Sequence, residues 1–424
     1  MHDIRILRDN LGAFRDAMRR RGKIDQMGPL VDRAEQLDRD RRLLIQAGDE
    51  RKAARNSATQ EVARRKKAGE DADDIIKRTR VLGEEISRLS SELSAAEGEL
   101  GAILLQLPNI TLPEVPDGGE ENNVVLRTWE IPRSSNGVVP HWEIGERLGI
   151  LDLERGAKIA GSGFAVLRGP LARLTRALMT FMIDVHTREH GYEEVWVPFL
   201  VNRASMTGTG QLPKFEEDMY GVSGDDLFLV PTGEVPVTNL YRDEVLDSAV
   251  LPKGIVTYTP CFRREAGAHG KDTRGLLRVH QFDKVELVRF STPEVAASQL
   301  ELMTSHAETI LQRLGLPYRV KLLASGDTSF ASEKTYDLEV WSPGVEKWLE
   351  VSSCSMCGEF QARRSNIRYR PAPGEKPRFV HTLNGSALAF ARTTAALLEH
   401  YQQPRGTIGV PDVLQPYVGS ASLG

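Results

Sequence analysis

Residues 82–107, LGEEISRLSSELSAAEGELGAILLQL, carry the pattern that decides the fold of the N-terminal part of this chain. Their apolar side chains recur at alternating spacings of four and three residues, at Leu82, Ile86, Leu89, Leu93, Ala96, Leu100, Ile103 and Leu107. This spacing places one apolar seam along a supercoiling α-helix. The stretch therefore predicts a long helix that packs against a second helix.

The second helix is predicted in the residues before this stretch. Residues 30–107 contain no proline, and Arg, Lys, Glu, Gln and Ala dominate them, as in long exposed helices. Residues 66–71, KKAGED, interrupt the pattern with a glycine that suits a helix reversal. We expect an antiparallel helical hairpin over residues 29–109, with arms about 55 Å long at 1.5 Å per residue.

Basic side chains gather near the expected tip of this hairpin. A solvated helix face explains a generic run of charges. A projecting hairpin buries little surface, however, and contact with a phosphate backbone is the functional alternative. The side chains that we predict to bind nucleic acid are Arg51, Arg55, Arg64, Arg65, Lys66 and Lys67.

The helical pattern ends in residues 107–123, LPNITLPEVPDGGEENN, which hold three prolines and two glycines. Such a stretch is typical of a domain boundary. Short β-branched or aromatic runs and frequent turns follow it, which favours a mixed, largely antiparallel sheet with helices. We therefore predict an α+β protein with two domains, residues 1–112 and residues 113–424.

Composition excludes several classes of protein. Of the 424 residues, 40% are hydrophobic and 27% are charged, which is ordinary for a folded soluble domain. No run approaches the roughly 18 apolar residues of a membrane helix, and MHDIRILRDN lacks the apolar core of a signal peptide. The three cysteines cannot form a disulfide framework. We expect a cytoplasmic protein without a membrane partner.

Two predicted strands, around residues 259–265 and 278–288, flank a polar loop over residues 268–275. A period of two places Arg263 and Glu265 on one face of the first strand, and Phe282, Lys284 and Glu286 on one face of the second. A solvated sheet face with surface ion pairs is one interpretation. A hollow for a ligand with anionic, aromatic and cationic parts, such as ATP beside an amino acid, is the other.

Two further segments offer candidate ligands. Residues 348–357 include Cys354-x-x-Cys357, but the absence of a second pair and the strand context argue against zinc, so no structural zinc is expected. Glu350 with its neighbouring hydroxyls suits Mg²⁺ better. In residues 381–392, a turn at Gly385-Ser386 is expected to precede a helix, with Arg392 in the second turn of that helix. Arg392 is expected either to bind an anion or an aromatic ring, or to be a structural arginine.

The ordered combination of these segments with residues 207–220, TGTGQLPKFEEDMY, and residues 231–242, PTGEVPVTNLYR, resembles the bacterial-type seryl-tRNA synthetases over essentially the whole chain. The resemblance implies a class II aminoacyl-tRNA synthetase, in which an antiparallel sheet flanked by helices forms the catalytic domain of a homodimer. Residues 171–198, 262–282 and 385–392 are similar to motifs 1, 2 and 3 of that class. Motif 1 is the dimer element.

The resemblance also implies an ATP site with Mg²⁺. It assigns the α-phosphate and substrate carboxylate to Arg263, the adenine amino group to Glu265, and the two faces of adenine to Phe282 and Arg392. Glu350 and Ser353 are expected to position Mg²⁺. Strict strand alternation pairs Glu350 with Ser352 instead, so a local irregularity is expected there. Further ATP contacts are expected from Arg264, Val279, Val351 and Ser352.

By the same resemblance, serine is bound by Thr232, Gly233, Glu234, Arg263, Glu286 and Ser386, and the acceptor end of tRNA is met by His269, Lys271 and Arg274. Family members usually carry alanine at the position of Gly233 and often glycine at that of Ala391. A missing methyl at Gly233 predicts a methyl-sized vacancy beside the substrate, with weaker rejection of bulkier serine analogues or of inhibitors that mimic seryl-adenylate. Neutral drift at a small-residue position is the alternative interpretation.

The resemblance implies that serine is activated with ATP to seryl-adenylate and transferred to tRNA(Ser), with tRNA(Sec) as a further acceptor. One alternative is a paralogue that serves a biosynthetic pathway or inhibitor resistance. Another is a catalytically dead tRNA-binding module. The basic arm favours tRNA as acceptor, and the joint presence of Arg263, Glu265, Phe282, Glu350 and Arg392 argues against a dead site.

Overall fold

The computed structural model describes residues 1–266, 274–404 and 406–424. The chain divides into two compact units, Met1–Leu107 and Pro108–Gly424. No helix in the described part of the chain is long and apolar enough to cross a membrane.

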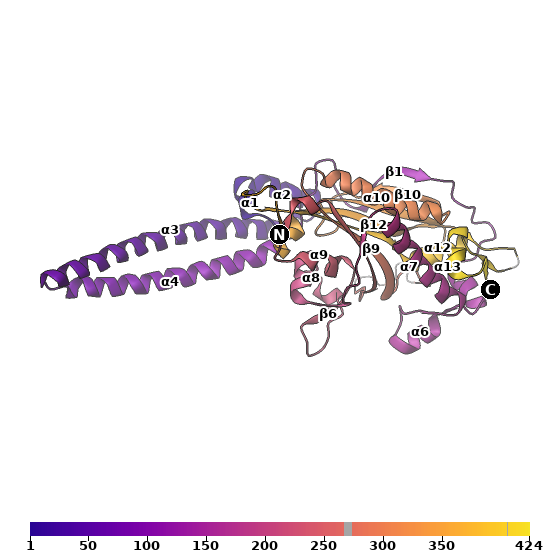
Figure 1. Ribbon diagram of the computed structural model, residues 1–424, viewed down its shortest axis with the longest axis horizontal. Helices are drawn as coiled ribbons and strands as arrows, with labels where there is room; N and C mark the ends of the chain where they lie inside the picture. The colour runs from indigo at the N-terminus through magenta and orange to yellow at the C-terminus, as the bar shows by residue number, and fades with distance from the viewer. Residues whose placement is uncertain (267–273, 405) are drawn as a thin grey trace. The chain divides into compact units, whose positions relative to one another are not determined.

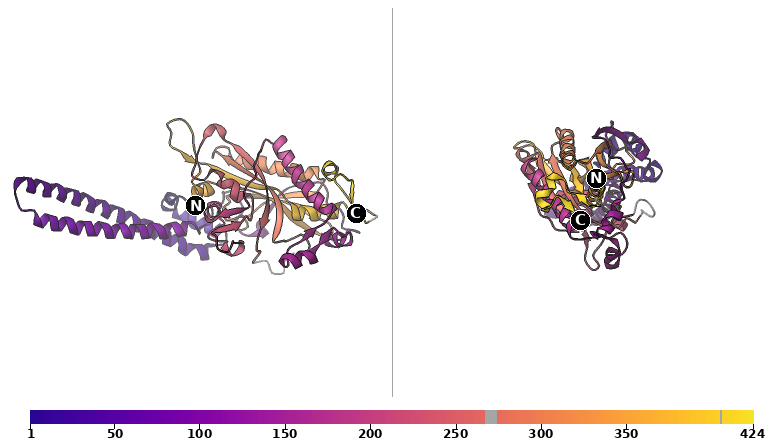
Figure 2. Two further views of the ribbon diagram at one scale, coloured as in Figure 1. Left: turned by 60° about the horizontal axis from the view of Figure 1, so that its bottom comes forward. Right: turned by 90° about the vertical axis from the view of Figure 1, so that its right-hand side faces the viewer.

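The N-terminal unit contains the predicted helical hairpin. Helices α1 (Ile4–Asp9) and α2 (Leu11–Arg20) precede α3 (Ile24–Ala68), and α4 (Asp73–Leu104) returns beside α3 (Figures 1 and 2). Helix α3 ends at Gly69, whose φ of 75° is a left-handed conformation that glycine adopts without strain. Leu82, Leu100 and Ile103 of the apolar seam are buried.

The two arms of the hairpin were expected to be equally long. They are not, since α3 has 45 residues and α4 has 32. Helix α3 begins at Ile24 and includes Pro29, which removes one backbone hydrogen bond from the helix. Helix α2 packs against α3, and Val31 and Ala34 of α3 are buried. This packing outweighs the hydrogen bond that Pro29 removes.

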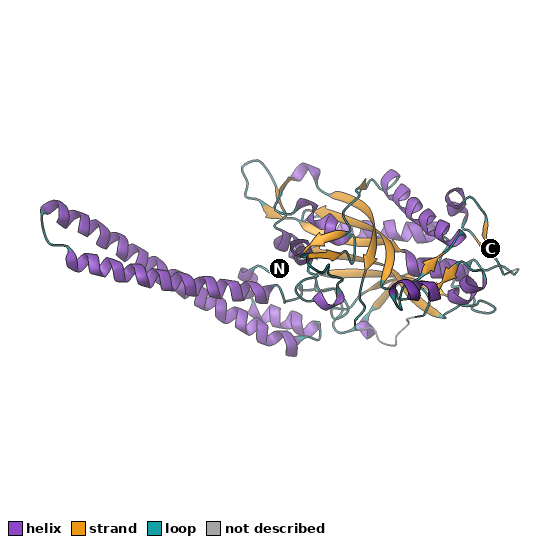
Figure 3. Ribbon diagram, turned by 90° about the horizontal axis from the view of Figure 1, so that it is seen from below, coloured by secondary structure: helices purple, strands orange, loops and turns teal. Residues whose placement is uncertain are grey.

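The C-terminal unit is built on an eight-stranded sheet in its described part, coloured orange in Figure 3. Neighbouring strands are antiparallel, except that β4 runs parallel to β8. The α+β fold with a largely antiparallel sheet is thus confirmed. In spatial order the strands are β1 (Val124–Trp129), β10 (Tyr318–Leu322), β11 (Lys334–Ser342), β12 (Lys347–Gly358), β15 (His381–Ala389), β9 (Gln281–Ser291), β8 (Lys253–Phe262) and β4 (Glu193–Glu194).

Three helices, α7 (Pro170–Arg188), α10 (Ala296–Arg313) and α12 (Phe390–His400), share one large apolar core with the sheet. Leu178 of α7, Met303 of α10 and Leu397 of α12 are almost fully buried in it. The shorter helices are α5 (His141–Arg147), α6 (Leu153–Ala160), α8 (Arg203–Thr209), α9 (Glu234–Thr238), α11 (Phe360–Ser365) and α13 (Gln415–Val418).

The remaining strands form small sheets at the edges of the unit. They are β2 (Leu151–Asp152) with β3 (Val166–Leu167), β5 (Leu200–Asn202) with β6 (Leu227–Leu229), β7 (Val245–Asp247) with β13 (Arg368–Arg370) and β14 (Arg378–Phe379), and β16 (Ile408–Gly409) with β17 (Ser422–Leu423).

Three local predictions around the site need correction. Strand β8 ends at Phe262, so Arg263 and Glu265 follow the strand. Gly385 and Ser386 lie within β15, which pairs with β12 on one side and β9 on the other, so they do not form a turn. Helix α12 therefore begins only at Phe390, and Arg392 lies in its first turn.

The irregularity expected near Glu350 is confirmed as a β-bulge. On the neighbouring strand β11, Leu338 pairs with Ser352 and Glu339 pairs with Glu350, which leaves Val351 as an extra residue of β12. The bulge changes the alternation of side chains, and it brings Glu350 and Ser353 to the same side of the sheet.

Candidate active site

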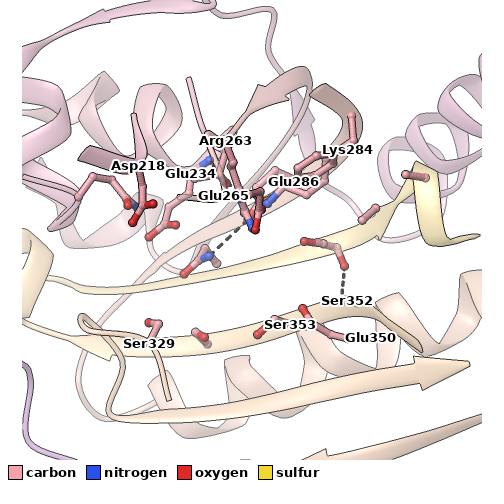
Figure 4. Close-up of a pocket in the computed structure, with 18 of the residues that line it drawn as sticks. Asp218, Glu234, Arg263, Glu265, Lys284, Glu286, Ser329, Glu350, Ser352 and Ser353 are labelled. Atoms are coloured by element: carbon pink, nitrogen blue, oxygen red, sulfur yellow. Dashed lines mark hydrogen bonds and ion pairs between the residues drawn. The ribbon is translucent and has the colours of Figure 1, made fainter. Parts of the chain in front are cut away.

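A cavity of about 630 Å³ in the C-terminal unit gathers most of the predicted site residues. Figure 4 shows Arg263, Glu265 and Glu286 on one side of it, with Glu350 and Ser353 across from them. The predicted residues that line the cavity are Thr232, Glu234, Arg263, Glu265, Val279, Phe282, Glu286, Glu350, Val351, Ser352, Ser353, Ser386 and Arg392.

The face of β9 supplies the charged wall at the amino-acid end of the cavity. Phe282, Lys284 and Glu286 all line the cavity, as their period of two predicted. Lys284 forms an ion pair with Glu286, and its Nζ donates a hydrogen bond to Thr232 Oγ1 at 2.9 Å. Asn384 Nδ2 donates to the second Glu286 oxygen at 3.3 Å. The Glu286 carboxylate is therefore buried but compensated.

A second carboxyl group, that of Glu234 at the start of α9, shares this end of the cavity. Its Oε1 accepts a hydrogen bond from Gln361 Nε2 at 2.5 Å. Burial, and then repulsion by the Glu286 carboxylate, raise the pKa of Glu234 to about 7. The two carboxyl groups favour a cationic ligand group at this end.

Arg263 and Glu265 enter the cavity from the turn after β8. Arg263 Nε donates a hydrogen bond to the carbonyl of Pro231 at 3.3 Å, and its guanidinium lies 5.2 Å from the centre of the Phe282 ring. Glu265 has a φ of 52° and pairs with Arg278 at 3.4 Å. The turn and the start of β9 thus present a cation, a carboxylate and an aromatic face to one hollow.

Arg392 and Glu350 close the other side. Arg392 Nη1 donates to the Glu350 carbonyl at 2.9 Å and lies 3.3 Å from the Glu350 carboxylate, while Nε donates to the Leu277 carbonyl at 3.0 Å. Ser352 Oγ donates to the carbonyl of Ser386 at 2.5 Å, which ties β12 to β15. The bulged strand β12 therefore holds Glu350 and Ser353 in defined positions.

Glu350 and Ser353 fit a magnesium ion that takes most of its ligands from phosphate and water. Glu350 and Ser353 both line the cavity and offer hard oxygen atoms. Residues 1–266, 274–404 and 406–424 contain no group of three or more His, Cys, Asp or Glu side chains that could hold a metal ion. Mg²⁺ needs few protein ligands when phosphate oxygens and water complete its octahedron, so the two groups match its requirements.

Two predicted residues lie outside the cavity wall. Arg264 is exposed, and its backbone N–H donates to the Asp218 carbonyl at 3.0 Å. Gly233 faces the sheet: a Cβ there would lie 2.9 Å from Thr257 Cγ2 and 3.1 Å from Glu286 Cβ. The predicted vacancy beside the substrate is therefore wrong, because α9 packs closely on β8 and β9 at this position.

The predicted nucleic-acid ligands are distributed over the arm and one loop. On the arm, Arg51 pairs with Glu85 at 2.8 Å, whereas Arg64 and Arg65 both pair with Glu61. Arg55 is half-buried, and Lys66 and Lys67 are exposed. In the loop, Arg274 is exposed and lies over the Trp142 ring at 4.8 Å. His269 and Lys271 lie outside the described residues.

The structure adds residues to the site that sequence reasoning did not assign. Lys284 had a usable signal, because it lies on the same strand face as Phe282 and Glu286. Gln361 and Asn384 had none, because they reach Glu234 and Glu286 across 127 and 98 positions of the chain.

Comparison with known proteins gives one consistent result. The model of the "Seryl-tRNA synthetase N-terminal domain" matches residues 1–111, and the model of the "tRNA synthetase class II core domain (G, H, P, S and T)" matches residues 215–401. A serine–tRNA ligase of Gemmatimonas aurantiaca is 63% identical over 424 residues, which cover 100% of both chains.

Solved structures agree with this result. The seryl-tRNA synthetase of Pyrococcus horikoshii complexed with ATP has a TM-score of 0.95 at 36% identity, over 100% of this chain and 99% of that one. The cytoplasmic serine–tRNA ligase of Naegleria fowleri in complex with AMP has a TM-score of 0.89 at 31% identity, over 100% and 98% of the two chains.

Proposed function

The chain belongs to the seryl-tRNA synthetase family of class II ligases, and we propose that its cavity is the place where serine is activated with ATP. The observation that carries this proposal is the convergence of Glu286, Arg263, Phe282 and the Glu350–Ser353 pair on one hollow. They match, in turn, an ammonium group, a phosphate, an aromatic base and a magnesium ion.

The serine end of the cavity lies at Glu286. Its buried carboxylate binds the substrate ammonium, and Thr232 and Glu234 complete this end. Ser386 lines the same cavity and recognises the substrate hydroxyl. A polar pocket of this kind rejects alanine, because alanine leaves the buried hydrogen-bonding groups without a partner.

The ATP end lies between the β8 turn and α12. Arg263 binds the α-phosphate and the substrate carboxylate, Glu265 binds the adenine amino group, and Phe282 and Arg392 enclose the adenine ring. Glu350 and Ser353 would hold Mg²⁺, which would neutralise phosphate charge. The likeness to the Pyrococcus horikoshii protein, which is complexed with ATP, supports this assignment.

The reaction then requires positioning and charge neutralisation more than a strong base. A serine carboxylate oxygen attacks the α-phosphorus in line, and the bond to pyrophosphate breaks, which gives seryl-adenylate. Arg263 lies where it can neutralise charge that develops on the α-phosphate. The 3′-terminal ribose hydroxyl of tRNA next attacks the seryl carbonyl, and AMP leaves.

Residues 1–112 form the tRNA-binding domain in this proposal, and residues 113–424 form the catalytic domain. The basic side chains of the arm bind tRNA(Ser), and tRNA(Sec) is a further acceptor. The protein works as a cytoplasmic homodimer. Trp196, which is 68% exposed, lies within residues 171–198, the segment that resembles the dimer element.

Amino-acid-dependent ATP–pyrophosphate exchange tests the proposed function. We expect exchange with serine and little or none with threonine, alanine or cysteine. Arg263→Ala and Glu286→Ala are each expected to lower kcat/KM for serine at least about a hundredfold. In Arg263→Ala the α-phosphate loses its cation, and in Glu286→Ala the serine ammonium loses its carboxylate partner. Arg155→Ala, which removes an exposed arginine paired with Asp152, is the control. Exchange without serine dependence, or unchanged exchange in both site variants, would contradict the proposal.

A further inference from the structure

Gln361 lies behind the serine end of the cavity and does not line it. It belongs to α11, and its side chain is fully buried. Its Nε2 donates hydrogen bonds to Glu234 Oε1 at 2.5 Å and to the Thr209 carbonyl at 3.2 Å. Its Oε1 accepts a hydrogen bond from Thr382 Oγ1 at 2.7 Å. Both ends of this side-chain amide therefore have partners.

These contacts fix which end of the amide faces Glu234. The Thr382 hydroxyl donates to the amide oxygen, and Nε2, which only donates, meets two oxygen acceptors. A flipped amide would place its oxygen against the Glu234 carboxyl group and the Thr209 carbonyl, so that acceptors would face acceptors. Gln361 is thus held as a donor to Glu234, and such a donor favours the ionised form of a carboxyl group.

Charged groups from several elements act on the Glu234 carboxyl group. Burial, and then the Glu286 carboxylate, raise its pKa to about 7. The groups that act in the opposite direction are Gln361 on α11, Lys284 on β9 and Arg263 after β8. The Cys357 thiol on β12 also faces Glu234, and burial holds the pKa of this thiol well above its usual range, so it carries no charge.

The substrate ammonium is neutralised at this end of the cavity only when Glu234 is ionised. Lys284 already forms an ion pair with Glu286, and the proposed function assigns Arg263 to the substrate carboxylate and the α-phosphate. A serine ammonium and an ionised Glu234 complete a set of two ammonium groups and two carboxylates. With a protonated Glu234, the same ammonium would be an excess positive charge in a buried site, which is costly.

We propose that Gln361 is a positioning residue for serine recognition: with Thr382 behind it, Gln361 holds the Glu234 carboxyl group ionised and in place, so that Glu234 and Glu286 together bind the substrate ammonium. This inference rests on the proposed function, because it takes serine as the ligand of this cavity. Serine then binds the ionised form of Glu234. Where Glu234 is protonated in the empty site, its proton passes to solvent as serine binds.

Calorimetric titration of the full-length protein with L-serine at pH 6.0, 7.0 and 8.5 tests the proposal. The Kd of the unaltered protein is expected to fall about tenfold from pH 6.0 to pH 8.5, because the pKa of Glu234 is about 7 and only its ionised form binds. Glu234→Gln is expected to bind serine more weakly, with a Kd that changes less than about twofold over this range, since its amide does not titrate.

Gln361→Met removes the donor to Glu234 and raises the pKa of that carboxyl group further. The Kd for serine is expected to rise at least about threefold at pH 7.0 and less than about twofold at pH 8.5. Thr382→Val, which leaves the amide oxygen without its donor, is expected to act in the same direction by a smaller amount.

Gln402→Met is the matched control for the loss of a partly buried glutamine. Both ends of the Gln402 amide have partners, because Nε2 donates to the Val139 carbonyl at 2.6 Å and Oε1 accepts from the Val139 N–H at 3.1 Å. Gln402 does not line the cavity, so this variant is expected to leave the Kd for serine unchanged at each pH.

An equal rise in Kd at all three pH values in Gln361→Met would overturn the proposal, because a residue that only supports the fold affects both forms of Glu234 alike. An unchanged Kd in Gln361→Met, a pH dependence that persists in Glu234→Gln, or failure of both Gln361→Met and Thr382→Val to fold would overturn it as well. Failure of the proposed function is distinguishable, since it appears in the unaltered protein as an absence of serine-dependent exchange.

Discussion

Gly233 matters because it has no side chain, and not because of its backbone conformation. Its φ of −63° and ψ of −19° are open to any residue, so the backbone does not require glycine there. The absent side chain matters instead, because a Cβ would press on Thr257 Cγ2 at 2.9 Å and on Glu286 Cβ at 3.1 Å. Gly233 thus permits the close approach of α9 to β8 and to β9, the strand that carries Glu286.

Gly233→Ala is therefore expected to push α9 away from β8 and β9. We expect a loss of about 1–3 kcal/mol in the free energy of unfolding from overpacking, together with a several-fold higher KM for serine. Denaturant unfolding and serine-dependent exchange measure the two effects. Gly98→Ala is the control, because nothing lies within 4 Å of its Cβ position on α4. If Gly233→Ala changes neither the KM for serine nor the free energy of unfolding, then α9 accommodates the methyl group and the prediction is wrong.

At the scale of elements, three histidines join the end of α7 to α10. The rings of His190 and His306 stack at 3.9 Å between centres, and His186 Nδ1 lies 3.0 Å from His190 Nδ1. His306 Nδ1 also lies 3.2 Å from the Tyr192 hydroxyl. A hydrogen bond between two ring nitrogens requires the acceptor ring to be neutral, and two stacked rings that were both protonated would repel each other.

The charged neighbours of the histidines do not reverse this preference. Arg313 on α10 and Arg289 on β9 disfavour protonation, and Glu189 after α7, which favours it for His190, is itself paired with Arg313 at 2.5 Å. Burial lowers the pKa of His186 and His190, and burial, followed by repulsion from His190 and Arg289, lowers the pKa of His306 to about 4.

These pKa shifts predict that the contact between the end of α7 and α10 loses stability in acid. A histidine whose pKa is lower in the folded than in the unfolded state stabilises the fold above about pH 6.5, and this stability is lost as the pH falls from about 6.5 to 4. For His306 alone, about 2 kcal/mol is lost by pH 5. Urea unfolding at pH 7.5 and 5.0 is expected to show a smaller loss in His306→Phe, which keeps a ring but cannot titrate. The same loss in both proteins would exclude His306 as its source.

At the scale of the whole molecule, one unit of the chain holds a long hairpin with basic side chains near its tip, and the other unit holds the whole cavity. Every residue that lines the cavity belongs to Pro108–Gly424. The arm presents exposed Lys66 and Lys67 beside Gly69, where α3 ends. Adenylate formation and tRNA binding are therefore expected to be separable functions.

Shortening the arm tests this separation. The pairs Arg41–Glu97 and Arg51–Glu85 give the register of the two helices, so residues 49–88 can be replaced by a short glycine-rich linker between Gly48 and Leu89. Serine-dependent exchange is expected to stay within about twofold of the full protein, whereas kcat/KM for tRNA charging falls at least about a hundredfold because the phosphate contacts are lost. The cut spares Asn109, which donates to the Ala331 and Cys357 carbonyls at 2.9 Å. Unchanged charging by the folded, shortened protein would show that the arm does not bind tRNA.

The sequence by itself determined the features that depend on neighbours along the chain. The four-three seam of residues 82–107 predicted the hairpin, and Gly69 predicted its reversal, because both follow from the geometry of one helix and its end. The shared face of Phe282, Lys284 and Glu286 followed from the period of a single strand. The roles of those residues came from the resemblance to a family, since a period identifies a face but not a ligand.

Only the tertiary structure decided the features that depend on pairing between distant segments. Gly385 and Ser386 read locally as a turn, yet hydrogen bonds from β12 and β9 on both sides hold them in a strand. The bulge at Val351 exists because β12 must pair with β11 out of simple register, and it selects which side chains of β12 face the cavity. Likewise, Gln361 meets Glu234 and Lys284 meets Thr232 only after the sheet has formed. Strand pairing and burial are properties of segments far apart in the chain, and local sequence preferences do not fix them.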